Sequence, residues 1–314
     1  MNKLFISSVA AFVVTIALGF TVFFLFVLDS KGKPEVSSAA SSLMPGEQTE
    51  TKQDHPYLPP SLDDIPEGED GELIKLGLRE HNETNMVLDG YVGNNLSCAS
   101  CHADGGVGSS LDLVGISKTY PQYNPRAGKE VTIEDRINGC FKRSMNGKPL
   151  PLDSQEMKAM VAYYNYISIN VPDGTKERPW AKMPKAEGDL AILDVEAGRE
   201  LYNKACITCH GEGGEGGASG LPLWGEKSYN IGAGMARVRT AGGFIKKYMP
   251  KAPMGGYEAG SFTDEEAMNI AAYINSMARP DFPDKIYDWP KGDAPDDAAY
   301  ETLAGKRIRT IIKR

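Results

Sequence analysis

The chain has 314 residues, a formal net charge of −8 and a sequence pI near 5.2. This length suits about two ordinary domains, each large enough to bury a core. The acidic balance argues against general nucleic-acid binding, which needs a basic surface to neutralise phosphates.

The N-terminal segment predicts a membrane anchor. Residues 4–28 form a run of 25 uncharged residues that is rich in Leu, Ile, Val and Phe and follows Lys3. Such a run exceeds the roughly 7 to 15 apolar residues of a removable signal core and is long enough to span a bilayer. We therefore expect residues 1–29 to be an uncleaved single-pass anchor, with cleavage near Ala39 as the alternative.

A flexible linker is expected over residues 30–69. The stretch is rich in Ser, Pro, Glu and Asp and shows no apolar periodicity. A segment of this composition cannot bury a core, so it predicts a tether between the anchor and the rest of the chain.

Two five-residue motifs follow the linker, CASCH at 98–102 and CITCH at 206–210. The pattern Cys-x-x-Cys-His is typical of c-type haem attachment. Its two sulfurs add to the porphyrin vinyl groups as thioethers, and its histidine binds the iron. The motifs predict two covalently bound c-type haems. The expected thioether cysteines are Cys98, Cys101, Cys206 and Cys209, and the expected proximal ligands are His102 and His210.

The two motifs belong to a duplicated unit. They begin 108 residues apart, and helix-opening residues Ser154 and Thr263 lie 109 apart, as do Tyr164 and Tyr273. Glu156 and Glu266 stand three residues after Asp153 and Thr263, which is the spacing of a capping box. Each half thus has the order of a small cytochrome c domain.

We expect an all-α fold of two tandem cytochrome c-type domains, because no segment alternates apolar and polar residues as a strand does. Pro, Gly and charged residues mark a linker between the domains, and the C-terminal end is basic. The expected boundaries are 70–175 for domain 1, 176–192 for the linker, 193–285 for domain 2 and 286–314 for a tail, which is expected to be a solvated strap.

The sixth ligand of each haem is expected at equivalent positions of the two halves. Met249, followed by proline, lies 39 residues after His210, and Cys140 lies 38 residues after His102. A thioether or imidazole is the usual sixth ligand of an electron-transfer haem. Cys140 is then a ligand that carries substrate sulfur, an inert thiolate ligand, or a buried structural thiol. Met145 and Met254 share the 109-residue offset and are alternative ligands.

The segment around Cys140, RINGCFKRSMNG at 136–147, resembles the dihaem thiosulfate dehydrogenases, some of which also act as tetrathionate reductases. Further matching segments are GNNLS at 93–97, YPQY at 120–123, GAGMAR at 232–237 and FI at 244–245. Together they cover roughly residues 70 to 280.

The resemblance implies that two thiosulfates are joined to tetrathionate, or the reverse, at a cysteine-ligated haem. Cys140 would be the distal ligand of haem 1 and the catalytic thiol, and Met249 the distal ligand of haem 2. Electrons would leave through haem 2 to a cytochrome c or a membrane respiratory chain, on the outer face of the bacterial cytoplasmic membrane. The family often has asparagine or lysine where this chain has Tyr248, which puts a redox-linked ligand exchange at haem 2 in doubt.

Positive charge beside Cys140 suits dianionic substrates. Arg136, Lys142 and Arg143 flank the cysteine, and an arginine fork matches the oxygens of a sulfonate. Arg136 and Arg143 are therefore predicted to act with Cys140 in catalysis.

Three other functions account for part of the pattern. A non-catalytic dihaem electron-transfer cytochrome explains both motifs but leaves Cys140 and its arginines without a role. A sulfur-carrier subunit of a multienzyme thiosulfate-oxidising complex explains the cysteine but not a second haem as electron exit. A dihaem peroxidase needs a displaceable distal histidine, for which His55 and His81 are the spare candidates.

Overall fold

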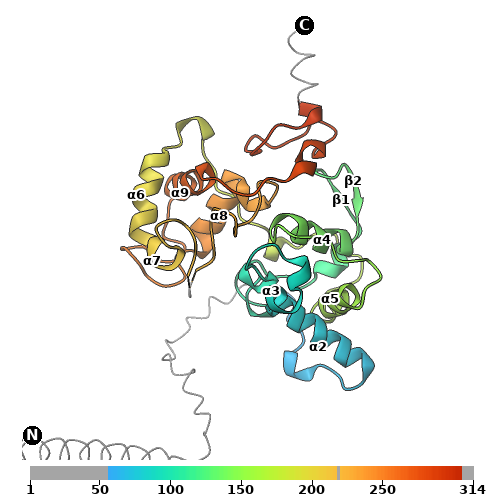
Figure 1. Ribbon diagram of the computed structural model, residues 1–314. Helices are drawn as coiled ribbons and strands as arrows, with labels where there is room; N and C mark the ends of the chain where they lie inside the picture. The colour runs from blue at the N-terminus through green and yellow to red at the C-terminus, as the bar shows by residue number, and fades with distance from the viewer. Residues whose placement is uncertain (1–55, 218–219, 306–314) are drawn as a thin grey trace, which may run out of the picture. The chain divides into compact units, whose positions relative to one another are not determined.

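The computed structural model describes residues 56–217 and 220–305 (Figure 1). The predicted anchor at 1–29, most of the predicted linker at 30–69 and the basic end at 306–314 lie outside the described residues. Among the described helices, none is long and apolar enough to cross a membrane.

The first domain is built around the crossing of two helices, α2 and α5, which pack against each other. A Cβ atom at Gly77 would lie 2.0 Å from the carbonyl oxygen of Ala159, so only glycine permits this close approach. Buried Phe141, Met160 and Tyr163 belong to the core of this domain. Its helices are α2 (Glu69–Asn82), α3 (Thr84–Val87), α4 (Ile133–Arg143) and α5 (Gln155–Tyr166).

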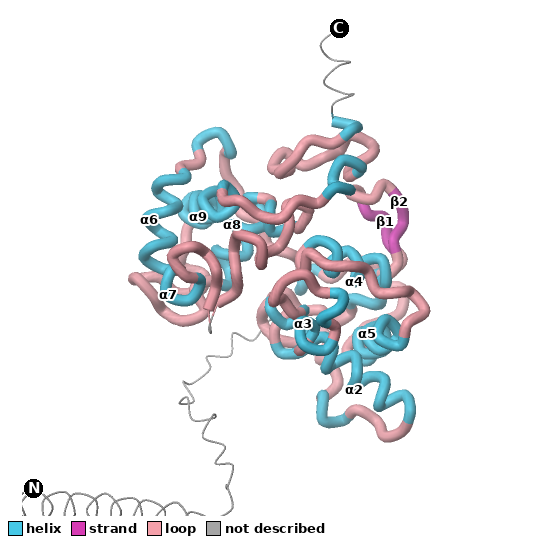
Figure 2. The backbone as a smooth tube through the Cα atoms, in the orientation of Figure 1, coloured by secondary structure: helices cyan, strands magenta, loops and turns pink. Residues whose placement is uncertain are grey.

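The second domain repeats this crossing with α6 and α9, and α8 also packs on α9 (Figure 2). A Cβ atom at Gly198 would lie 2.0 Å from the carbonyl oxygen of Asn269, as at the crossing in the first domain. The core includes Tyr202, Phe262 and Ile270. The helices are α6 (Val195–Ala205), α7 (Ile207–His210), α8 (Val238–Tyr248) and α9 (Asp264–Ser276).

The expectation that the chain has no strands is wrong. β1 (Gln122–Asn124) and β2 (Lys129–Val131) form an antiparallel hairpin in which Gln122 pairs with Val131. Each strand has three residues, which is too short for apolar and polar residues to alternate visibly. The hairpin is a local feature, and the cores of both domains are helical.

The helix starts expected from the repeat are found with one change. Thr263 forms a capping box with Glu266 at the start of α9. At the start of α5, however, the Ser154 side chain accepts the hydrogen bond from the Met157 backbone N–H, so Ser154 and not Asp153 is the cap. The serine hydroxyl satisfies a backbone donor that the helix itself leaves without an acceptor.

The start of the tail is held by a buried ion pair, which corrects the expectation of a solvated strap. Asp288, 5% exposed, accepts hydrogen bonds from both terminal nitrogens of Arg143 at 2.9 and 2.7 Å and from the Tyr300 hydroxyl at 2.5 Å. The next residue, Trp289, is buried, and the Arg126 guanidinium lies 4.8 Å from its ring centroid. The segment after α9 is therefore fastened to the first domain.

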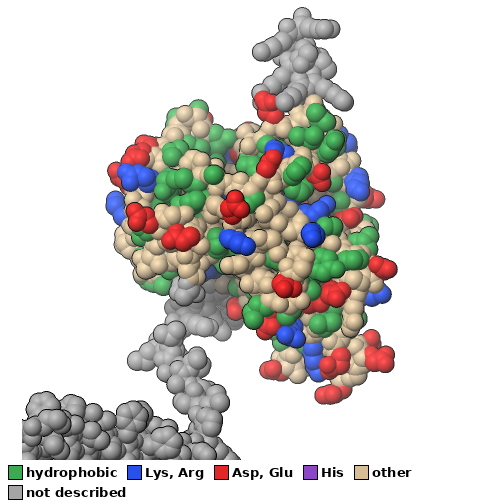
Figure 3. Space-filling model, viewed as in Figure 1, with side chains coloured by type: hydrophobic (Ala, Val, Ile, Leu, Met, Phe, Trp, Pro, Cys, Tyr) green, Lys and Arg blue, Asp and Glu red, His purple; other side chains and the backbone are tan. Residues whose placement is uncertain are grey.

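On the face shown in Figure 3, acidic and basic side chains are interspersed.

Glu80 is a buried carboxyl group of the first domain that lacks a full set of hydrogen-bond partners in the part of the chain that the structure describes. Glu80 on α2 is 1% exposed, and within the described residues its Oε2 atom has no hydrogen-bond partner. Burial, with a smaller contribution from the negative charge of Glu156, raises the pKa of Glu80 from 4.5 to about 8. Between pH 4.5 and about 8, therefore, the Glu80 carboxyl is protonated in the folded chain and ionised in the unfolded chain.

Replacing Glu80 with Gln is expected to stabilise the protein at alkaline pH. Because the folded pKa is raised, the stability of the wild type is fully present below pH 4.5 and is lost as the pH rises through about 8. The variant lacks this loss. Its free energy of unfolding should exceed that of the wild type by about 4 kcal/mol at pH 8.5 and should be nearly equal to it at pH 4.5. Urea unfolding of the holoprotein at both pH values measures this. Exposed Glu67→Gln is the control, and an equal gain at both pH values would contradict the explanation.

Candidate active site at the first haem motif

Helix α4 brings together the two residues expected to perform the chemistry. Thr132 begins the helix with a capping box: its hydroxyl accepts from the Asp135 N–H at 3.3 Å, and the Asp135 carboxylate accepts from the Thr132 N–H at 3.2 Å. Arg136 and Cys140 are four residues apart, so they lie on one face of the helix. The Arg136 Nη1 atom donates to the Cys140 Sγ atom at 2.9 Å.

The guanidinium and the sulfur interact electrostatically. The negative charge of Cys140 is the largest contribution that raises the pKa of Arg136 above its usual range, and desolvation opposes it. Arg136 is solvent-exposed and Cys140 is half-buried. A permanent cation that donates to sulfur is the environment in which cysteine acts as a nucleophile or metal ligand.

Cys140 also lies within electrostatic reach of the first haem motif. Burial raises the pKa of Cys98 to about 12 and that of Cys101 to about 11, and the charge of Cys140 adds to both shifts. All five cysteines of the chain are described, and none forms a disulfide. The lone cysteine is therefore near enough to the cysteine pair of the first motif to act on it electrostatically, and its role as a ligand of the first haem stays a prediction.

The two motif histidines are held in the same way. The Nδ1 atom of His102 donates to the carbonyl oxygen of Leu111 at 2.6 Å, and the Nδ1 atom of His210 donates to that of Leu221 at 2.8 Å. This fixes each ring so that Nε2 is the atom available to iron, as in metal sites generally. Burial lowers the pKa of His102 to about 4 and also lowers that of His210, which keeps both rings neutral, as a ligand must be. Both sites therefore suit a haem.

His81 supports the first motif and is not available as a ligand. Its Nε2 atom lies 2.9 Å from the His102 carbonyl oxygen, and its Nδ1 atom lies 3.1 Å from the Tyr164 hydroxyl. Both ring nitrogens of His81 are thus engaged, so among the described residues the peroxidase alternative has no spare histidine to act as a distal ligand. His55 lies outside the described residues. No sequence pattern distinguished His81, because its partners are 21 and 83 residues away.

Arg143 does not share the Cys140 site. Its guanidinium is committed to Asp288 and lies 4.3 Å from the Phe282 ring centroid. Another cation, Arg178, lies near the first motif, although the sequence predicted only that it belongs to the linker at 176–192. Its Nη1 atom donates to the carbonyl oxygens of Asp112 and Val114 at 2.9 and 3.1 Å, and its charge contributes to the lowered pKa of His102.

At the second motif, Met249 directly follows α8 and packs against the core that also contacts Cys206 and Trp224. Met254 instead pairs through its backbone with Tyr257 at 2.8 and 3.0 Å. This placement favours Met249 over Met254 as the distal residue of the second haem. Met145, the alternative in the first domain, is a buried member of the first core.

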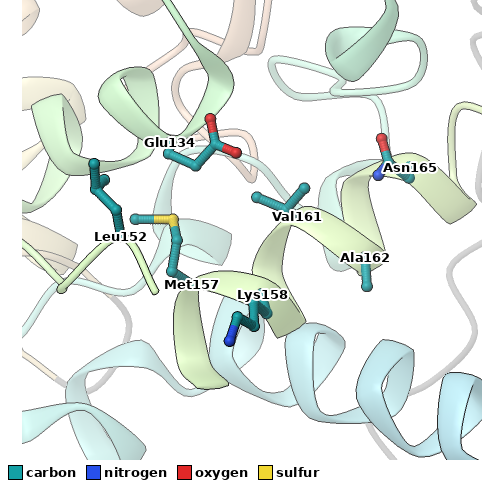
Figure 4. A pocket seen from close by; sticks show the side chains of 7 residues that line it. All are labelled: Glu134, Leu152, Met157, Lys158, Val161, Ala162 and Asn165. Atoms are coloured by element: carbon teal, nitrogen blue, oxygen red, sulfur yellow. The ribbon is translucent and has the colours of Figure 1, made fainter. Parts of the chain in front are cut away.

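A groove elsewhere on the first domain includes none of the expected site residues (Figure 4). Side chains from α4, α5 and the segment between them line it. They are Glu134, Leu152, Met157, Lys158, Val161, Ala162 and Asn165.

Two helical domains, each with a Cys-x-x-Cys-His motif and a histidine oriented by a backbone carbonyl, define a dihaem cytochrome c. Residues 91–172 match the SoxA/TsdA cytochrome c domain family, and residues 193–274 match the family of cytochrome c oxidase, cbb3-type, subunit III. The chain carries two covalently bound c-type haems.

Relatives extend the match over most of the chain. A thiosulfate dehydrogenase of Psychrobacter arcticus is 38% identical over 262 residues, covering 79% of this chain and 76% of that protein. One of Allochromatium vinosum is 38% identical over 246 residues, covering 73% and 84%. The solved thiosulfate dehydrogenase TsdBA of Marichromatium purpuratum is 34% identical with a TM-score of 0.65, covering 71% of this chain and 50% of that chain. The present chain therefore matches half the length of that solved protein. It belongs to the thiosulfate dehydrogenase family.

Proposed function

We propose that this protein oxidises thiosulfate and joins two molecules into tetrathionate at Cys140. The observation that carries the proposal is the 2.9 Å contact between Arg136 and Cys140 beside the first haem motif. A non-catalytic cytochrome needs neither a lone thiol nor a guanidinium there. The family relationship supports thiosulfate as the substrate.

The haems, when bound, would accept the two electrons released per tetrathionate and pass them on. His102 and Cys140 would hold the first haem, and His210 and Met249 the second. A thiolate ligand favours ferric iron more than a thioether does, so electrons are expected to run from the first haem to the second.

The reaction balances in two steps at Cys140. In the first, the cysteine sulfur forms an S–S bond with the sulfane sulfur of one thiosulfate, and two electrons leave. In the second, the sulfane sulfur of another thiosulfate attacks that sulfane sulfur, tetrathionate departs and the Cys140 thiolate is regenerated. Arg136 would orient the sulfonate groups and offset their charge. Arg143, expected from the sequence to contact substrate, is assigned instead to holding the tail through Asp288.

This proposal includes tetrathionate as the product and the reverse reaction as a second activity. It also includes a cytochrome c or respiratory-chain electron partner and a location outside the cytoplasmic membrane. The anchor at 1–29 remains a prediction from the sequence. The test is to give the purified holoprotein thiosulfate and an electron acceptor, and to count products. Two thiosulfates consumed and two electrons accepted per tetrathionate are expected. Inactivity in this assay and with reduced dye plus tetrathionate would favour the electron-transfer alternative.

Replacing Arg136 with Gln is expected to lower kcat/KM for thiosulfate by about thirtyfold, because a charge-assisted bond to sulfur and a sulfonate contact are lost. Arg136→Lys keeps the charge but not the fork and should lose less. Steady-state kinetics measure both. Lys142→Gln, which removes a neighbouring cation from the same helix, is the matched control and should stay within about twofold of the wild type. Equal losses in the two Gln variants would indicate general charge attraction and not a specific contact.

A further inference from the structure

The carbonyl that orients His102 belongs to a residue in a strained conformation. Leu111 has φ 45°, in the left-handed region that favours glycine. Its carbonyl oxygen accepts from His102 Nδ1 at 2.6 Å. A non-glycine residue stays in such a conformation only when its surroundings hold it there. The orientation of His102 therefore depends on what holds Leu111.

Part of that support comes from the second domain. The backbone N–H of Leu111 donates to the Tyr248 hydroxyl at 3.5 Å, a long hydrogen bond across 137 residues of sequence. Tyr248 is 7% exposed, and its ring lies 5.2 Å from the ring of Phe244, one helical turn earlier. It is the last residue of α8 and directly precedes Met249. One side chain therefore links the loop of His102 to the segment of Met249.

A second contact supports this juxtaposition. Lys251 lies within electrostatic reach of Asp104, two residues after His102, and its ammonium group lies 5.7 Å from the centroid of the Tyr248 ring. The segment that contains the distal residue of the second haem thus lies against the attachment loop of the first haem.

We propose that Tyr248 is a positioning residue that couples the proximal ligand of the first haem to the distal-ligand segment of the second. It holds Leu111 so that the carbonyl of Leu111 stays on His102 Nδ1. That hydrogen bond raises the basicity of the imidazole and so favours ferric iron. Because Tyr248 adjoins Met249, the same residue belongs to the support of the first site and to the segment of the second. The inference rests on the ligand roles proposed above for His102 and Met249.

The test is a redox titration of the holoprotein without substrate, followed by EPR to resolve the two ferric haems by their axial ligands. Tyr248→Phe removes only the hydroxyl. It is expected to shift the ferric–ferrous equilibrium of the first haem about threefold toward the ferrous form, the lower end of the effect of one hydrogen bond. Tyr257→Phe is the matched control in the same domain. Its hydroxyl bonds Glu266, and its removal should leave the first haem unchanged.

A double-mutant cycle separates positioning from a general disturbance. In Leu111→Gly the glycine adopts the same left-handed backbone conformation without strain. The Tyr248 hydroxyl should then not be needed to hold residue 111 in that conformation. In that background Tyr248→Phe is expected to produce less than half of its original shift. An unchanged equilibrium in Tyr248→Phe, or the same shift in both backgrounds, would overturn the proposal. The titration uses no thiosulfate, so its outcome does not depend on whether the proposed reaction is correct.

Discussion

Replacing Cys140 with Ser is expected to lower thiosulfate oxidation by about a thousandfold or more. The hydroxyl of serine is neither a strong nucleophile toward sulfur nor a thiolate ligand, and it cannot form the S–S bond of the first step. The four thioether cysteines and both motif histidines are untouched, so both haems should stay attached. Turnover measured as tetrathionate formed per haem gives the loss.

The control for this variant is the state of the cofactors. Two covalently bound haems per chain, and a second haem that chemical reductants still reduce, show that the loss is specific. The ferric spectrum of the first haem should change, because its sixth ligand is altered. Substantial activity in Cys140→Ser would rule out the catalytic thiol, whereas an unchanged spectrum with lost activity would rule out only its role as an iron ligand.

Replacing Asp288 with Asn is expected to lower the free energy of unfolding by about 3 kcal/mol. The carboxylate is buried between two arginines: Arg143 donates to it at 2.7 and 2.9 Å, and the Arg126 Nε atom lies 3.9 Å away. Burial, together with repulsion from Arg143, lowers the pKa of Arg126 to about 10. An amide keeps an acceptor for a hydrogen bond but no charge, so two partly buried cations would lose their counter-ion.

Urea unfolding of the holoprotein at pH 7 measures the change. Asp281→Asn is the matched control, because Asp281 also forms an ion pair, with Lys285, but its side chain is largely exposed. It should change the free energy by no more than about 0.5 kcal/mol. Adding Arg143→Met to Asp288→Asn should recover part of the loss, because the unpaired cation is removed as well. Equal effects of the two Asn variants would show that the ion pair does not hold the tail.

The helix pattern of the chain was largely predictable because its signals are local. The cap at Thr263 and the helices that begin after Ser154 and Thr263, α5 and α9, follow from residues within one or two turns. The hairpin of β1 and β2 was missed, since three-residue strands leave no period. The close helix crossings at Gly77 and Gly198 were also missed, because the carbonyl that each glycine faces lies 82 or 71 residues away in the chain.

In the candidate site, too, the local features were predictable and the contacts between residues distant in the chain were not. Helical spacing places Arg136 four residues before Cys140 and Arg143 three residues after it, so both arginines can lie beside the sulfur. The sequence could not choose between them. Asp288, 145 residues from Arg143, engages that guanidinium and leaves Arg136 with the thiol.

The sequence by itself determined the cofactors, the duplication and the lone thiol, because haem attachment is covalent chemistry within five consecutive residues and the repeat is a fixed offset. Only the tertiary structure decided which cation meets the thiol, what holds the proximal histidine and how Tyr248 reaches Leu111. Tyr248 and Leu111 are 137 positions apart, and Asp288 and Arg143 are 145 apart, whereas the bond from His102 to Leu111 depends on a backbone conformation that local sequence does not indicate. The energies of these contacts arise only when the chain is packed and water is excluded.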